Sequence, residues 1–240
     1  MTGTIISNSV RFVKLRLKNY GIFGGDNLIE FNSHRTLIVG QSGLGKTTIW
    51  KALRQLGPVP GVDANICNNA LQMSLEIDVL TAGNRSLIER YRGIIFLSAE
   101  TEYPSSFHEL PFAVDLDRTS LDLVRNETNK IFRTFVSNEK RHNDFLEDLD
   151  SKSMLPGERL CLVLAYAFAY RRIMNLDVPV VLDSPFVVLT YEQRNSIRSF
   201  LKKQLFQQII IGSYSEFDDK DYTHYKLVYK DGYSRITNDR

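Results

Sequence analysis

The sequence predicts an α/β protein with a mixed sheet, an antiparallel β-hairpin lobe and a small helical lobe. A glycine-rich turn near residue 40 joins a short apolar strand to a helix. Two later segments, 178–182 and 208–211, are typical of strands buried on both faces of a parallel sheet. Segment 71–91 alternates apolar and polar residues around a central turn, which is the pattern of a β-hairpin.

The remaining elements follow from apolar periodicity and from the glycines and prolines that interrupt it. The predicted strands are 10–17, 28–31, 36–39, 71–80, 86–91, 93–97, 178–182, 208–211, 225–229 and 234–236. The predicted helices are 48–53, ending before the turn at 57–61, then 119–150, 156–174 and 191–206. We expect a single domain over 1–240, with a loop and hairpin lobe at 1–110, a helical lobe at 111–177 and C-terminal strands at 178–240.

Residues 40–47 fit the motif G-x-x-x-x-G-K-[ST] without a mismatch, between a predicted strand and a predicted helix. In this phosphate loop, backbone N–H groups and the helix N-terminus bind a polyphosphate, lysine reaches the β- and γ-phosphates, and the hydroxyl ligates Mg²⁺. The sequence therefore predicts a site for ATP and Mg²⁺. Its nucleotide-binding residues are Gly40, Gln41, Ser42, Gly43, Leu44, Gly45, Lys46, Thr47 and Thr48.

A phosphate loop also needs a carboxylate that holds the metal ion. The apolar strand 178–182 ends in Asp183, followed by Ser184, which is the arrangement of a Walker B strand. We therefore predict Thr47 and Asp183 as metal-binding residues and Lys46, Asp183 and Ser184 as catalytic ones.

The composition limits the other functions. The chain has 240 residues, 43% of them apolar, and a net charge of only +2, so no strong overall field for nucleic acid is expected. No apolar run is long enough to span a membrane, and the first residues lack the pattern of a secretion signal. Cys67 and Cys161 are far apart in the sequence, which fits a reducing cytoplasm. The four scattered histidines predict no metal site beyond the Mg²⁺ bound with nucleotide.

With these motifs in place, the chain resembles the ABC-type ATPase heads of the SMC, RecF, RecN and DndD families, from about Val10 to Phe217. Residues 14–23 and 28–31 are similar to the first hairpin of these heads, and the phosphate loop follows at the same distance. Residues 154–159, Met-Leu-Pro-Gly-Glu-Arg, look like the signature motif Leu-Ser-x-Gly-Glu. The resemblance implies that Gly157 and Glu158 approach the γ-phosphate of ATP held by a second head. A plain helix start also explains this stretch, because proline and glutamate favour a first turn.

Several positions depart from the pattern of these families. The signature serine is replaced by Leu155, and the usual glutamate after the Walker B aspartate is replaced by Ser184. The switch histidine falls on Tyr214, and the D-loop pattern falls on Leu189-Thr190. A missing catalytic base costs about 10²–10⁴ in rate, so binding is better supported than turnover. The Q-loop glutamine is not identified, with Glu100 or Glu102 as the candidates.

The long coiled coil of these families is also missing, because the chain between Leu97 and Met154 has no sustained heptads. Basic residues interleaved with acidic ones favour a solvated face over a DNA-binding patch; they are Arg125, Lys130, Arg133, Lys140, Arg141, Arg171, Arg172, Lys202 and Lys203. The aromatic residues Trp50, Tyr166, Phe168 and Tyr170 are interpreted as core or interface residues.

Three hypotheses follow from these observations. The first is a slow Mg²⁺-dependent ATPase that dimerises around ATP and drives or gates DNA repair or defence against foreign DNA. The second is a nucleotide-gated assembly module with little turnover that holds an effector such as a nuclease. A P-loop kinase or GTPase is the third, weakened by the lack of an Asn-Lys-x-Asp motif. We expect a cytoplasmic homodimer with a protein effector, DNA bound directly or through that partner, and no membrane association.

Overall fold

The computed structural model describes residues 10–32, 34–54, 74–81, 95–98, 117–136, 155–204, 208–214 and 220–238. The chain divides into two compact units. Unit 1 comprises Met1–Ser98, Asp177–Ser184 and Phe206–Arg240, and unit 2 comprises Ala99–Leu176 and Pro185–Leu205. Several predicted features lie outside the described residues: strand 86–91, the helical pattern after 136, Cys67, Glu100, Glu102, Lys140, Arg141 and Met154. The predicted boundaries at 110 and 177 stay a prediction.

Unit 1 contains a six-stranded sheet in the order β5-β6-β7-β3-β8-β9. Its strands are β3 (Arg35–Val39), β5 (Ile95–Ser98), β6 (Val180–Asp183), β7 (Ile209–Ser213), β8 (Thr223–Lys230) and β9 (Tyr233–Asn238). The first five are parallel, and only β9 runs antiparallel to its neighbour. All four residues of β6 are buried, which confirms the prediction for this apolar run.

A second sheet of unit 1 has the order β2-β1-β4, with both pairs antiparallel. Its strands are β1 (Val10–Lys18), β2 (Asp26–Glu30) and β4 (Ser74–Thr81). The predicted strand 71–80 is therefore confirmed as a strand, and in the described part of the chain it pairs with β1. The predicted pairing of β1 with β2 is also confirmed.

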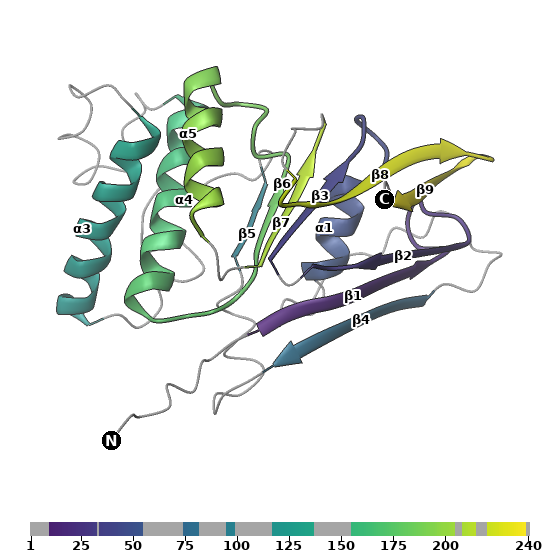
Figure 1. Cartoon of the computed structure of the whole chain (residues 1–240), viewed down its shortest axis with the longest axis horizontal. Helices are drawn as coiled ribbons and strands as arrows, with labels where there is room; N and C mark the ends of the chain where they lie inside the picture. Colours follow the sequence, from purple (N-terminus) through teal and green to yellow (C-terminus); the bar gives the residue numbers. More distant parts are fainter. Residues whose placement is uncertain are drawn as a thin grey trace. The chain divides into compact units, whose positions relative to one another are not determined.

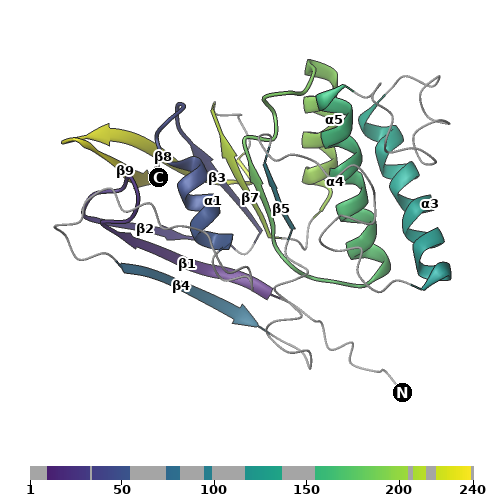
Figure 2. The ribbon, with the colours of Figure 1, turned by 180° about the vertical axis from the view of Figure 1, so that it is seen from behind.

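Helix α1 (Lys46–Arg54) packs on the parallel strands of the six-stranded sheet, in contact with β6 and β7. Its apolar face buries Ile49, Trp50 and Leu53, and the Trp50 ring lies edge-on to Phe96 of β5 at 6.0 Å. Both ribbon views show the three-stranded sheet as a separate layer below α1 (Figure 1, Figure 2). Trp50 is thus a core residue, as predicted.

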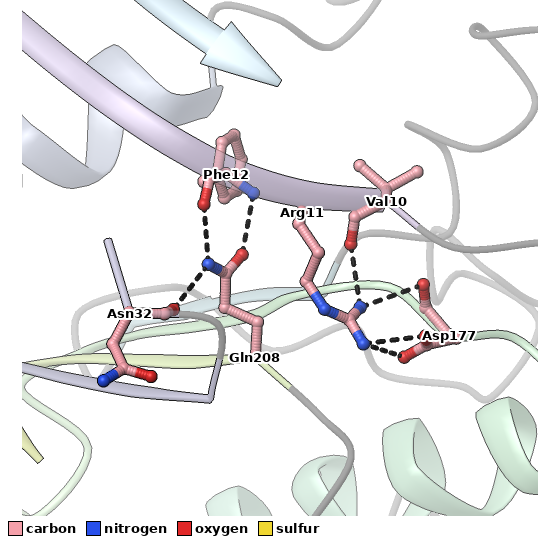
Figure 3. A network of polar contacts seen from close by, with 6 residues as sticks. All are labelled: Val10, Arg11, Phe12, Asn32, Asp177 and Gln208. Carbon is pink, nitrogen blue, oxygen red and sulfur yellow. Dashed lines mark hydrogen bonds and ion pairs between the residues drawn. The ribbon is translucent and has the colours of Figure 1, made fainter. Parts of the chain in front are cut away.

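Gln208, which is fully buried just before β7, connects the two sheets of unit 1 (Figure 3). Its amide nitrogen donates to the carbonyls of Phe12 at 2.7 Å and Asn32 at 3.0 Å, and its amide oxygen accepts from Phe12 N at 2.7 Å. Phe12 is in register with Val79 of β4, but β2 pairs with β1 only from Lys14 onward, so the Phe12 backbone has no ladder partner on its other side. Gln208 supplies the missing partner and thereby fixes β1 to the entry of β7.

A second link in the same region is the ion pair of Arg11 with Asp177 (Figure 3). Arg11 Nη2 donates to both carboxylate oxygens of Asp177 at 2.7 Å, and Nη1 donates to Asp177 O at 3.3 Å, so the bonds are charge-assisted. Val10 N also donates to Asp177 O at 2.9 Å. The start of β1 is therefore fixed to the chain that leads into β6, the strand that carries Asp183.

The described part of unit 2 contains the helices α3 (Arg118–Phe135), α4 (Pro156–Ile173) and α5 (Tyr191–Lys202), which run side by side in Figure 1. Phe200 of α5 joins them, since its ring lies 5.1 Å from that of Phe135 and 5.0 Å from that of Phe168. Residues 160–169 of α4 are all buried, so this helix is the core of the unit. Among the described residues, none of the helices is long and apolar enough to cross a membrane.

One prediction for unit 2 is wrong. The charged neighbours of Arg171 predicted that its side chain lies on a solvated face, but this residue is only 1% exposed. It lies on the packed side of α4, and its guanidinium is 5.8 Å from the centre of the Phe168 ring.

Cys161 of α4 is buried. Burial, together with the negative charge of Glu158, raises the pKa of its thiol to about 12. This cysteine is therefore a protonated core residue at neutral pH.

Candidate nucleotide-binding site

The loop between β3 and α1 has the backbone geometry that its glycines predict. Gly43 and Gly45 have φ angles of +81° and +102°, which other residues rarely adopt. Gln41, Ser42 and Gly43 are exposed, whereas Gly45 and Lys46 are buried at the base of the loop. The loop thus presents its tip to solvent directly before the N-terminus of α1, which is where backbone N–H groups attract an anion.

The loop between β1 and β2 and the strand β8 pack closely against the phosphate loop. A Cβ atom on Gly45 would lie 2.7 Å from the Phe23 ring and 2.9 Å from Ile22, both in the loop between β1 and β2. A Cβ atom on Gly40 would lie 2.8 Å from Leu227 of β8. These two glycines are needed for packing as well as for backbone conformation.

Lys46, the first residue of α1, points back toward the loop that precedes it. Its Nζ donates to Gly40 O at 2.6 Å and to Gln41 O at 2.8 Å. The same ammonium lies 3.9 Å from the centre of the Tyr214 ring, and Lys46 as a whole is only 7% exposed. A positive charge is therefore already positioned under the loop.

Thr47 and Asp183 meet although 136 positions separate them in the sequence. The Thr47 hydroxyl donates to Asp183 Oδ2 at 2.7 Å, and the Ser184 hydroxyl donates to Asp183 Oδ1 at 3.1 Å. Asp183 is 2% exposed, so its carboxylate depends on these hydroxyl donors in place of water. Ser184 has φ +52°, a left-handed conformation that non-glycine residues adopt mainly where the surrounding structure enforces it.

These residues fit the ligands that the motif implies. The exposed loop and Lys46 supply N–H groups and positive charge for phosphates. Thr47 and Asp183 supply the oxygen ligands that Mg²⁺ prefers. In the described part of the chain no three His, Cys, Asp or Glu side chains come together, so the other ligands of a metal here would be phosphate oxygens and water.

The predicted signature residues lie in unit 2, at the N-terminus of α4. Leu155 has the extended backbone of an N-cap residue but no side-chain oxygen, and Glu158 accepts a hydrogen bond from Leu155 N at 3.0 Å. Only half of a capping box is therefore present. A Cβ atom on Gly157 would lie 2.7 Å from Val188 O and 3.0 Å from Gln193 Oε1, so packing within unit 2 already requires glycine there.

Comparisons with known proteins agree with this geometry. The family model described as AAA domain matches residues 14–57, which span β1 to the phosphate loop and α1. Among solved structures, the SMC head domain from Thermotoga maritima has a TM-score of 0.58 at 18% identity, covering 96% of this chain and 99% of its own.

The chain has the fold of an SMC head.

Two further SMC heads extend this likeness. The Smc head bound to the C-winged helix domain of ScpA has a TM-score of 0.60 at 13% identity, over 94% of this chain and 97% of its own. The Smc head with an extended coiled coil, bound to the C-terminal domain of ScpA derived from Pyrococcus furiosus, reaches 0.61 at 11% identity, over 95% and 96%. A search of curated protein sequences gives no match. The α/β P-loop fold predicted from the sequence is confirmed.

Within this SMC-type fold, the predicted residues of unit 1 converge on one site. Lys46 donates to the carbonyls of the loop 40–45, and Thr47, Asp183 and Ser184 form a connected polar cluster. The predicted roles of Gly157 and Glu158 toward nucleotide stay a prediction. In the described structure, Glu158 caps its own helix and Gly157 packs against the chain at Val188.

Two contacts of this site were not predicted from the sequence: the packing of Phe23 against Gly45 and the position of the Tyr214 ring over Lys46. Nothing in the pattern of residues 19–25 indicated that Phe23 would lie under Gly45. The resemblance indicated Tyr214 only as the residue at the position of the switch histidine. It gave no sign that the Tyr214 ring contacts Lys46. The contact depends on the pairing of β7 with β3, which the sequence pattern does not indicate.

Proposed function

We propose that this chain is an SMC-like head that binds ATP with Mg²⁺, closes on a second head around the nucleotide, and hydrolyses ATP slowly. The observation that carries the proposal is the convergence of Lys46, Thr47 and Asp183 beside an exposed glycine loop. These are the three side chains that a P-loop ATPase needs for phosphate and metal. We further propose that residues 1–240 act together as one head.

Each residue then has a defined role. Lys46 exchanges its two carbonyl partners for phosphate oxygens, and the backbone of loop 40–45 wraps the phosphates. Thr47 and Asp183 would hold Mg²⁺ through their side-chain oxygens. Mg²⁺, when bound, would neutralise phosphate charge. Ser184 carries no carboxylate to polarise an attacking water, so turnover is expected to be slow.

The surroundings of α4 support a protein contact at its N-terminus. Gly157 packs against Val188 and Gln193, which brings the start of α4 close to the segment 187–193. Three apolar side chains of these two segments are exposed: Leu155 to 59%, Val187 to 52% and Tyr191 to 78%. Clustered exposed apolar side chains are typical of interaction surfaces. In the proposed assembly this surface meets the phosphate loop of a second head, in head-to-tail symmetry.

We place the head in the cytoplasm, in a process that repairs DNA or defends against foreign DNA, with a protein effector. Two of the similar SMC heads are bound to domains of ScpA, which supports a protein partner in general. DNA would be reached directly or through that partner.

A nucleotide-gated assembly module with little turnover is the second candidate. Two observations favour it: Ser184 replaces a general base, and Leu155 supplies no hydroxyl at the α4 N-terminus. Such a module would bind ATP and hold an effector such as a nuclease, and nucleotide release rather than hydrolysis would reset it.

One pair of measurements separates the two candidates. ATP turnover is measured with and without DNA, and the mass of the protein is measured by light scattering with and without Mg²⁺-ATP. Turnover together with an ATP-dependent increase in mass supports the ATPase. An increase in mass without turnover supports the assembly module. A folded protein that fails to bind ATP would exclude both.

A further inference from the structure

The ammonium of Lys46 has an aromatic partner in addition to the two loop carbonyls. The centre of the Tyr214 ring lies 3.9 Å from Lys46 Nζ, well within the range of about 6 Å over which a ring face attracts a cation. Tyr214 is 41% exposed and Lys46 is 7% exposed. Tyr214 is therefore the more accessible member of the pair.

The sheet fixes Tyr214 in this place. Strands β3 and β7 are parallel neighbours with Val39 opposite Ser213, and Gly40 N donates to Ser213 O at 3.0 Å. The residue after Ser213 must then lie beside the start of the phosphate loop. The contact between Tyr214 and Lys46 follows from backbone pairing, and not only from the rotamer of a surface side chain.

We propose that Tyr214 is a cap on Lys46 that competes with the phosphates of the nucleotide. This inference rests on the proposed function, since it assumes that Lys46 binds phosphate. In the nucleotide-free protein the ring and the carbonyls of Gly40 and Gln41 hold the ammonium. A phosphate must compete with these partners for the ammonium. The ring thereby lowers the affinity for nucleotide and slows its association.

The test uses a fluorescent ATP analogue and inorganic tripolyphosphate, with affinity and association rate measured for four proteins. Tyr214→Leu keeps an apolar side chain but removes the ring face, and Tyr214→Phe keeps the ring face but removes the hydroxyl. Tyr229→Leu is the matched control, because Tyr229 is a 70% exposed tyrosine of β8 in the same unit. The fourth protein is the unchanged chain.

Loss of the ring contact should tighten binding of both probes by about threefold to tenfold in Tyr214→Leu, mainly through faster association. Tyr214→Phe and Tyr229→Leu should bind as the unchanged protein does. Tripolyphosphate has no base, so equal tightening of both probes places the effect at the phosphates.

Unchanged or weaker binding in Tyr214→Leu would overturn the cap. So would a gain for the ATP analogue alone, which would mean that Tyr214 meets the base. Failure of the unchanged protein to bind either probe would overturn the proposed function itself. Melting curves for each variant confirm that the comparison is made on folded protein.

Discussion

Helices α1 and α4 both begin at a sequence predicted to meet phosphate, but the fold prepares the two ends differently. Before α1 the chain makes an exposed glycine loop, in which Lys46 of the first turn donates to the loop carbonyls and Thr47 donates to Asp183. Before α4 the N-cap residue is Leu155, and the carboxylate of Glu158 satisfies one backbone N–H of that end.

The two helix ends therefore differ in the polar groups that lie close to each of them within its own unit. The α1 end has a cation, a hydroxyl and a carboxylate within unit 1, which are the groups that the proposed nucleotide site requires. The α4 end contains no cation in its first turn except the exposed Arg159, and apolar side chains surround it. In the proposed assembly, a second head would bring the phosphates to this end.

The largest effect is expected for Lys46→Ala, which removes the cation of the α1 end. Two charge-assisted hydrogen bonds to phosphate are lost, so affinity for ATP should fall by about 100-fold or more. Isothermal titration calorimetry measures it. Lys51→Ala is the control, because Lys51 is an exposed lysine of the same helix and should have no effect. Equal affinity of Lys46→Ala and unchanged protein would exclude the phosphate-loop assignment.

Asp183→Asn should lower the affinity for Mg²⁺ in the presence of ATP by about 10- to 100-fold, because the amide lacks the negative charge of the carboxylate. Ser184→Ala should have a smaller effect, since it removes only the 3.1 Å hydrogen bond to Asp183. Titration of Mg²⁺ at fixed nucleotide compares the two variants. If Ser184→Ala were the more damaging substitution, the roles of the two residues would be reversed.

Gly45→Ala should destabilise the α1 end by about 1–3 kcal/mol, because φ is +102° and the new methyl group would meet Phe23. Gly43→Ala is the matched variant, with φ +81° but no atom within 4 Å of the added Cβ. Thermal melting should therefore show a larger loss for Gly45→Ala. Equal losses would mean that backbone conformation alone, and not the support by Phe23, determines the loop.

The smallest effect is expected at the other helix. Leu155→Ser adds the missing hydroxyl of the capping box and should stabilise the protein by about 1 kcal/mol, since Leu155 is exposed and contributes little to packing. Thr190→Ala is the opposite change in α5, whose capping box is complete, and should cost a similar amount. If closure uses the α4 end, Leu155→Ser should also lower the concentration at which ATP increases the mass of the protein. A decrease in melting temperature for Leu155→Ser would contradict the capping argument.

Local features of this protein were determined by the sequence alone. The motif at 40–47 predicted the strand–loop–helix, the apolar run before Asp183 predicted β6, and the segments 225–229 and 234–236 were correctly predicted as the strands β8 and β9. Each of these depends on neighbouring residues, because glycine conformations, apolar periodicity and helix starts act over a few positions.

Tertiary structure decided which distant residues meet. The hydrogen bond of Thr47 with Asp183, the support of Gly45 by Phe23 and the ring of Tyr214 over Lys46 all join segments far apart in sequence. Arg171 was predicted to be solvated because its neighbours are charged, yet it is buried because of the side of α4 on which it lies. Local patterns carry no information on which strands become neighbours in the sheet, and strand order is what brings Asp183 and Tyr214 to the phosphate loop.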